Sequence, residues 1–208
     1  MTNSHSSSHF DPIVEAVRYI KGEGKAPASI DVVNALLQAE KENKRAKSDY
    51  RYEQLVGEWR LGFVSGTRKV QPRPGASAVT TVGKGRFIPR FVRIAIAYEP
   101  LPENEQGSVT NSVALGPINL RLKGPTKFWQ KTNSLGFDFT AIKVSLNLLG
   151  SDWSAYDGEL RGGQTRDAAF KAQMLKDQAF FTFFLVDQDY IAARGRGGGL
   201  ALWIKEAA

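Results

Sequence analysis

The C-terminal stretch from Phe180 to Lys205 constrains the fold more than any other part of the chain. Its first segment, residues 180–186, carries large apolar side chains at almost every position. A strand that is apolar on both faces must be covered on both, so it belongs in a closed or sandwiched sheet. An Asp-Gln-Asp turn, a second strand, a glycine-rich turn and a last strand follow. This pattern predicts a mainly β fold with a small antiparallel β-barrel, a structure that often holds apolar ligands.

Period-two alternation of apolar and polar residues indicates further strands upstream. In segment 118–123, for example, isoleucine and leucine alternate with asparagine, arginine and lysine. We count eight to ten such strands, spaced as a meander or barrel requires. The residues predicted to line the barrel are Trp59, Leu61, Phe63, Ile94, Ile96, Phe137, Phe139 and Phe183.

The sequence divides into three predicted regions: a disordered leader (1–10), a helical extension (11–50) and the barrel (51–208). Asp11 and Pro12 are a typical helix start, with aspartate as the cap and proline in the first turn. Ser29 can cap a second helix, and we expect its charged end, residues 40–47, to be solvated. The leader lacks the charged and apolar regions of a secretory signal. A bacterial chain and the mature form of a targeted protein both remain open as origins.

Two residue types that serve much of enzyme chemistry are missing from the body of the chain. There is no cysteine, and the two histidines, His5 and His9, both lie in the leader. The body therefore cannot build a Ser-His-Asp or Cys-His site, a thiolate metal site or a disulfide. Asp187 and Asp189 stand close together, but their place between two strands predicts a turn. The sequence thus predicts no catalytic residue, metal or cofactor, and a protein that is not an enzyme.

The formal net charge of +7 is concentrated in one segment. Between Trp59 and Tyr98 there is no acidic residue and there are eight basic ones. Such a one-signed block indicates an anionic partner, with a merely solvated loop and strand face as the alternative. Nucleic acid is disfavoured, because only Phe87 and Phe91 are interleaved with the charges, too few for a stacking platform. The basic residues predicted to face a membrane are Arg68, Lys69, Arg73, Lys84, Arg86 and Arg90.

Gly57 and Trp59 open the first strong strand, and a late arginine, Arg194, precedes the last one. This arrangement resembles the lipocalin signature, in which an indole closes one barrel end and an arginine packs across it. We therefore predict that Trp59 and Arg194 close the barrel through a cation–π contact. The glycines after Arg194 predict a tight hairpin rather than a phosphate-binding loop, because a strand and not a helix follows them.

Three segments resemble the plastid-lipid-associated protein, or fibrillin, family. They are Leu-Val-Gly-Glu-Trp-Arg-Leu at 55–61, Phe-Asp-Phe-Thr at 137–140 and the stretch 181–203. Within that family, residues 187–199 are most similar to a branch that contains proteins described as harpin-binding. The resemblance extends from Ser48 to the C-terminus and implies a lipocalin-like barrel. The chain departs from the family at segment 200–204, where it has Leu-Ala-Leu-Trp-Ile and family members often have a Phe-Val-Phe-type strand. Pocket contacts that this strand makes in the family are therefore not carried over.

The resemblance implies non-enzymatic binding of a lipophilic molecule such as a prenylquinone, a carotenoid or a membrane lipid. It implies a location at the thylakoids or plastoglobules of plastids, or in the cytoplasm or at the thylakoid surface of a cyanobacterium. We expect the basic segment to hold the barrel mouth against anionic lipid. Two alternatives stay open: an enzyme like the bilin lyases, which attach a chromophore, and a protein-interaction scaffold whose barrel is filled by its own side chains.

Overall fold

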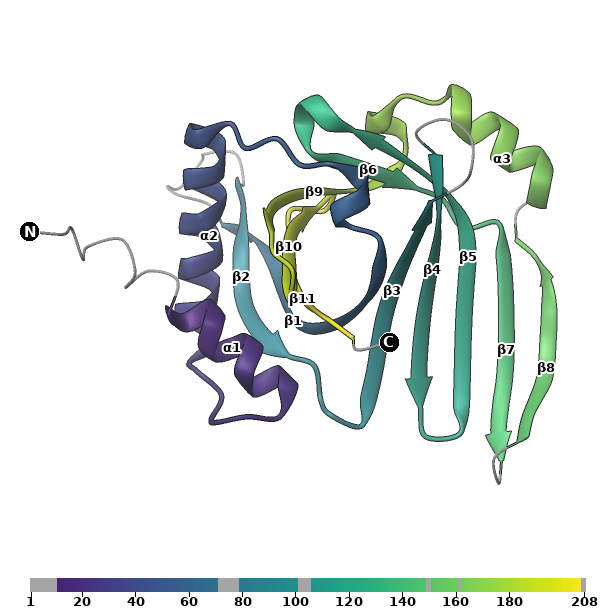
Figure 1. Ribbon diagram of the computed structural model, residues 1–208, viewed down its shortest axis with the longest axis horizontal. Helices are drawn as coiled ribbons and strands as arrows, with labels where there is room; N and C mark the ends of the chain where they lie inside the picture. The colour runs from purple at the N-terminus through teal and green to yellow at the C-terminus, as the bar shows by residue number, and fades with distance from the viewer. Residues whose placement is uncertain (1–10, 71–78, 101–105, 149–150, 161, 207–208) are drawn as a thin grey trace, which may run out of the picture.

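The computed structural model describes residues 11–70, 79–100, 106–148, 151–160 and 162–206. Eight of the described strands close into an antiparallel barrel, in which each strand pairs with the next one of the set and the last pairs with the first (Figure 1). These strands are β1 (Gly57–Val70), β3 (Val92–Pro100), β4 (Gln106–Leu115), β5 (Ile118–Trp129), β6 (Ser134–Phe137), β9 (Ala179–Val186), β10 (Tyr190–Gly195) and β11 (Leu200–Lys205). The predicted lipocalin-like barrel with N-terminal helices is confirmed.

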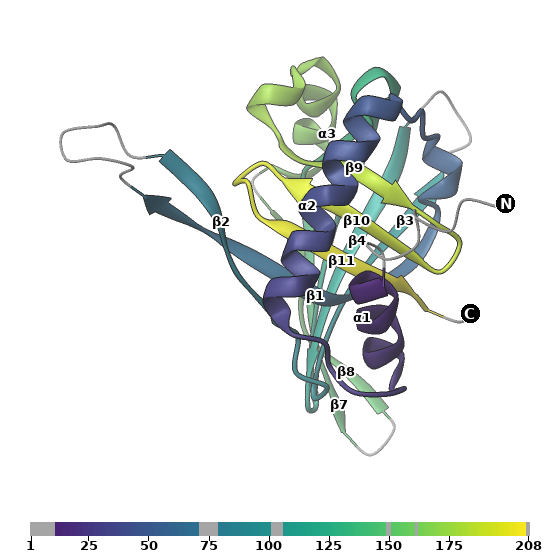
Figure 2. The same ribbon diagram turned by 90° about the vertical axis from the view of Figure 1, so that its left-hand side faces the viewer.

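Three more strands extend the sheet beyond the barrel. The long strand β1 pairs with β3 over its first residues and with β2 (Val79–Phe87) over the rest, so β1 and β2 form a ribbon that projects from the barrel (Figure 2). On another side, β7 (Ala141–Leu148) pairs with the first half of β5, and β8 (Ser151–Glu159) pairs with β7. The described residues thus form eleven strands, more than the eight to ten predicted. Strands β2 and β8 were not predicted from the sequence.

The helical extension covers one wall of the barrel from outside. Helices α1 (Asp11–Lys21) and α2 (Ser29–Ala46) pack on the outer face of β1, β9, β10 and β11. This outer core includes Ile13, Leu36 and Phe63, all fully buried. Gly62 permits the close approach of α1, because a Cβ at this position would lie 2.3 Å from Cδ1 of Ile20. None of the helices in the described part of the chain is long and apolar enough to cross a bilayer.

Two details of the helices differ from the predictions. Asp11 and Ser29 are the first residues of α1 and α2 rather than their caps, and Ala28 takes the cap position of α2 without a side-chain hydrogen bond. The end of α2 is not fully solvated, because Glu40 faces the barrel and pairs with an arginine of β10. A third helix, α3 (Gly163–Ala172), and the short 3₁₀ segments η1 (Tyr52–Gln54), η2 (Gln130–Thr132) and η3 (Leu175–Asp177) complete the described elements.

Candidate apolar binding surface

The inside of the barrel is a second core, separate from the one under the helices. Large side chains from opposite walls meet there, and Trp59, Tyr98, Leu135 and Phe183 are each at most 1 % exposed. The segment before β1 closes one end: Leu55 is fully buried, and its carbonyl accepts a hydrogen bond from Nε1 of Trp59 at 2.7 Å. We call this the closed end. The barrel is therefore packed with its own side chains around Trp59.

Most of the predicted lining residues do belong to this inner core. Trp59, Ile96 and Phe183 are buried in it, while Leu61, Phe137 and Phe139 pack at its margin and are half-buried. Away from the closed end, the margin becomes a ladder of aromatic rings. The centroid of Phe181 lies 5.2 Å from that of Phe137 and 5.2 Å from that of Trp203, and Phe137 lies 5.5 Å from Phe139.

The prediction for Phe63 is wrong. The register of β1 against β11 shifts between Leu61 and Phe63, and this bulge turns Phe63 to the outer face. There Phe63 packs under the helices, with its ring centroid 5.0 Å from that of Phe87. Val64 takes the next inward position and packs against the inner core.

The predicted contact between Arg194 and Trp59 is also wrong. Arg194 is two residues after Ala192 on β10, so both side chains lie on the same face of the strand. Ala192 belongs to the outer core. Arg194 therefore points outward and pairs with Glu40 through contacts of 2.7 and 2.5 Å. The cation over Trp59 is instead Lys205, whose Nζ lies 5.1 Å from the ring centroid. Lys205 follows Trp203 by two residues on β11, so its side chain lies on the same inward face and reaches the closed end.

The pair between Arg194 and Glu40 shifts the titration of both groups. The hydrogen bond from Arg194 lowers the pKa of the Glu40 carboxyl, against an opposing effect of burial. The pKa of Arg194 is raised by the same hydrogen bond. The pair ties α2 to β10 and has a structural role rather than one in a binding site.

Strands β3, β4, β5, β7 and β8 continue past the barrel as an open sheet (Figure 1). Because side chains alternate along a strand, Ile94 and Val92 of β3 lie on the same face as Ile96. The face that is inside the barrel at Ile96 therefore continues onto the open sheet. Two rows of paired residues make up this surface, which we call the apolar face. They are Ile94, Val113, Leu120, Val144 and Tyr156, and then Val92, Leu115, Ile118, Leu146 and Trp153.

The two faces of the open sheet differ sharply in polarity. The row between the two apolar rows contains Arg93, Asn119 and Ser145, and the next polar row contains Arg121 and Lys143. On the apolar face, Leu115 is 49 % and Ile118 is 48 % exposed. Ile94, which we predicted to line the barrel, lies on this face and is half-buried. The row that joins the barrel interior to the apolar face contains Ile96, Asn111, Leu122 and Ile142, of which only Asn111 is polar. This surface is covered in the barrel and open on the sheet.

The contribution of β8 to this surface was not predicted from the sequence. Trp153 and Tyr156 are three residues apart, which in a regular strand would place them on opposite faces. A bulge in the pairing of β7 with β8 inserts Ala155 and brings both onto the apolar face. Apolar residues three positions apart do not follow the period-two pattern of a regular strand, so the sequence pattern does not indicate that Trp153 and Tyr156 share a face.

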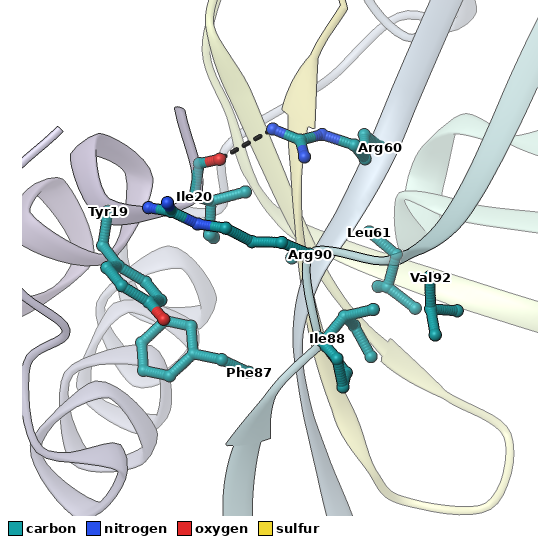
Figure 3. A pocket seen from close by; sticks show the side chains of 10 residues that line it. Tyr19, Ile20, Arg60, Leu61, Phe87, Ile88, Arg90 and Val92 are labelled. Carbon is teal, nitrogen blue, oxygen red and sulfur yellow. Dashed lines mark hydrogen bonds between the residues drawn. The ribbon is translucent and has the colours of Figure 1, made fainter. Parts of the chain in front are cut away.

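A small pocket lies where α1 meets β1 and the turn before β3 (Figure 3). Its volume of about 20 Å³ holds one water molecule, so it is no lipid site. Arg60 spans it and donates from Nη2 to the carbonyl of Ile20 at 2.7 Å, and the guanidinium of Arg90 lies 5.4 Å from the ring centroid of Tyr19. The pocket is a joint between helix and barrel.

A wider depression of about 580 Å³ lies beside the closed end. Charges of both signs line it, and they pair with one another: Lys21 with Asp189 at 3.3 Å, and Arg60 with Glu206 at 3.2 Å. Such a surface offers little net charge or apolar area to a ligand. In the described residues, no three Asp, Glu, His or Cys side chains gather as metal ligands would.

The predicted membrane-facing basic residues separate into two groups. Arg68, Lys69, Lys84 and Arg86 are exposed on the ribbon of β1 and β2, which leaves the barrel sideways (Figure 2). Arg90 is exposed in the turn before β3, and the remaining one, Arg73, lies outside the described residues. The structure therefore distributes the basic block over the ribbon and over one end of the open sheet.

Comparison with known proteins adds no relative to this description. The scan against protein-family models returns no match, and the search of curated proteins returns none either.

Proposed function

We propose that this protein binds lipophilic molecules without transforming them, and that the apolar face is the surface that receives them. The observation that carries the proposal is the continuity of the apolar face with the barrel interior along β3, from the buried Ile96 to Ile94 and Val92. Exposed apolar surfaces larger than a few hundred Å² mark sites for ligands, partners or membranes. Two cross-strand rows of aliphatic and aromatic side chains suit the long, featureless tail of such a molecule.

Simple energetics place the affinity in a moderate range. Burying about 400 Å² of apolar ligand surface at ~25 cal/mol/Å² contributes on the order of 10 kcal/mol. Association costs of roughly 4–15 kcal/mol offset much of that. Binding to an open face rather than in a deep cavity is consistent with transient uptake and release.

The resemblance to the plastid-lipid-associated family supports a prenylquinone, a carotenoid or a membrane lipid as the bound molecule. It also supports a location at thylakoid or plastoglobule membranes of plastids, or in a cyanobacterium at the thylakoid surface. The basic residues support peripheral contact with anionic lipid.

A titration with a benzoquinone that carries a decyl tail tests the proposal, because quinones quench tryptophan fluorescence and Trp153 lies on the apolar face. The double variant Leu120→Ser/Val144→Ser alters one cross-strand pair of that face. We expect it to weaken binding at least about tenfold, since each aliphatic side chain contributes roughly 1.5–3 kcal/mol when buried.

The matched control is Arg121→Ser/Lys143→Ser, the neighbouring pair on the opposite face. It is expected to keep the affinity of the original protein. Absence of saturable quenching, or an equal loss in both double variants, would refute the apolar face as the binding surface. Solvent extraction and mass spectrometry of protein from a photosynthetic host would then identify the natural ligand.

The filled barrel favours a second candidate, a scaffold for another protein. Trp59, Tyr98 and Phe183 occupy the interior, so a large ligand has no ready space around them. In this case a partner protein would cover the apolar face. A scaffold predicts no saturable binding of the quinone together with a clean solvent extract.

A further inference from the structure

One end of the open sheet gathers large apolar side chains from strands β4, β5 and β8 and from the turn before β3. Phe91 precedes β3, Leu115 and Ile118 flank the turn between β4 and β5, and Trp153 lies near the start of β8. We call these four residues the apolar end. Their exposed fractions are 74 %, 49 %, 48 % and 72 %, respectively, far above what large apolar residues of the barrel show.

The apolar end forms a continuous edge. Val92, next to Phe91, pairs with Leu115, Leu115 with Ile118, Ile118 with Leu146, and Leu146 with Trp153. Five strands at about 4.8 Å spacing make this edge roughly 20 Å wide. Both ribbon views place these strand ends at the bottom of the molecule, beyond the barrel (Figures 1 and 2). The strand ends that carry the four exposed side chains therefore lie along one edge of the sheet.

Exposed basic residues stand beside the apolar end. Arg90 adjoins Phe91, and Arg86 lies at the base of the ribbon, near the end of β2 and just before the same turn. The adjoining segment from Trp59 to Tyr98 contains no acidic residue. This combination of apolar tips and a basic margin complements an anionic, partly apolar surface. A second copy of the chain is a poor occupant, because each copy carries a formal charge of +7.

We infer that the protein docks on anionic lipid bilayers through the apolar end, with Phe91, Leu115, Ile118 and Trp153 entering the interface. Tryptophan and phenylalanine at loop tips suit the headgroup level, and arginine beside them meets anionic headgroups. The inference names the membrane contact of the proposed function and rests on that function. In this orientation the apolar face extends from the bilayer to the barrel. A lipid tail that moves along it stays in contact with apolar side chains.

Co-sedimentation with vesicles tests the inference on the full chain, using phosphatidylcholine mixed with phosphatidylglycerol and pure phosphatidylcholine as the reference. The double variant Phe91→Ser/Trp153→Ser is expected to lower partitioning into the mixed vesicles at least about tenfold. Both positions are exposed, so we expect the variant to fold, and circular dichroism with thermal unfolding checks this.

The control variant Arg68→Ser/Lys69→Ser removes charge from the exposed ribbon, which points away from the apolar end (Figure 2). It is expected to change partitioning less than about threefold, because its charges lie far from the docked surface. If the ribbon variant loses binding and the variant of the apolar end keeps it, the inference is overturned. The ribbon is then the contact.

Brominated lipids give a second readout, since they quench tryptophans that enter the bilayer. Trp59 and Trp203 are buried, and the half-buried Trp129 lies at the other end of β5 from Ile118, so we expect quenching in the original protein and its loss in Trp153→Phe. Quenching that persists in Trp153→Phe would count against the inference. A protein that binds the soluble quinone but not the vesicles refutes the docking surface alone, whereas failure to bind either refutes the proposed function as well.

Discussion

The two ends of strand β4 have the same pattern of residues but different surroundings. Val109, at the barrel end, is fully buried, whereas Leu115, at the other end on the same face, is 49 % exposed. The neighbouring strand β3 repeats this contrast, from Tyr98 at 1 % exposure to the half-buried Val92. Alternation therefore determines which face of a strand is apolar. Whether that face is covered depends on a second wall.

The second wall ends where β1 changes partners. β1 pairs with β3 only from Gly57 to Arg60 and then turns to β2. Beyond this point β3, β4 and β5 have no opposite wall among the strands of the barrel, and β7 and β8 widen them into the open sheet. The surface that we assign to lipid is thus a consequence of how the barrel closes.

Deletion of a core side chain gives the largest expected difference between the two regions. Trp59→Ala should lower the free energy of unfolding by about 3–5 kcal/mol, because it opens a cavity in the packed barrel. Leu115→Ser, on the open sheet, should change it by no more than about 0.5 kcal/mol. Urea denaturation of both variants measures the contrast. Equal losses would mean that the open sheet is covered in solution.

The pair that joins α2 to the barrel should have an intermediate effect. Glu40→Ala leaves the half-buried Arg194 without its carboxylate, at a cost of about 1–3 kcal/mol. Glu42→Ala on the same helix is the control, since Glu42 accepts only a local hydrogen bond from Gln38 among the described residues. Similar stability of the two variants would show that the pair contributes nothing beyond a surface contact.

Acid provides an independent check on the same pair. Because the pKa of Glu40 is lowered in the folded protein, the unfolded chain binds the proton more readily. The contribution of Glu40 is complete above the ordinary carboxyl value of 4.5 and is lost as the pH falls through the lowered folded-state value. Glu40→Ala should therefore lose less stability on acidification than the original protein does.

The smallest expected effect has the opposite sign. The hydroxyl of Tyr98 is buried in the barrel and finds no hydrogen-bond partner among the described residues, and burial raises its pKa. Tyr98→Phe should raise the free energy of unfolding by about 1 kcal/mol, because it removes an unsatisfied polar group. Tyr52→Phe should instead lower it, since the Tyr52 hydroxyl donates to the carbonyl of Glu99 at 3.1 Å. Destabilisation by Tyr98→Phe would indicate that a water molecule satisfies the hydroxyl.

Local pattern sufficed to predict the fold class and much of the inner core. Doubly apolar strands such as β9 require a cover on each face, which indicated a closed barrel. Alternation of apolar residues placed Trp59 and Ile96 inside it. The bulges could not be predicted, because they depend on how a strand pairs with its neighbour. One inserted residue moves every later side chain of the strand to the other face of the sheet. For that reason Phe63 was assigned to the wrong face, and Trp153 and Tyr156 were not recognised as neighbours.

The sequence by itself determined that this chain forms a barrel with apolar inner strand faces and a basic, acid-free segment. These properties follow from alternation and composition, which are local. Only the tertiary structure decided that β3, β4 and β5 extend past the opposite wall, that Arg194 pairs with Glu40, and that four exposed apolar residues meet at one edge. Each of these depends on which strands pair and for how long, and strand pairing is a contact between distant parts of the chain.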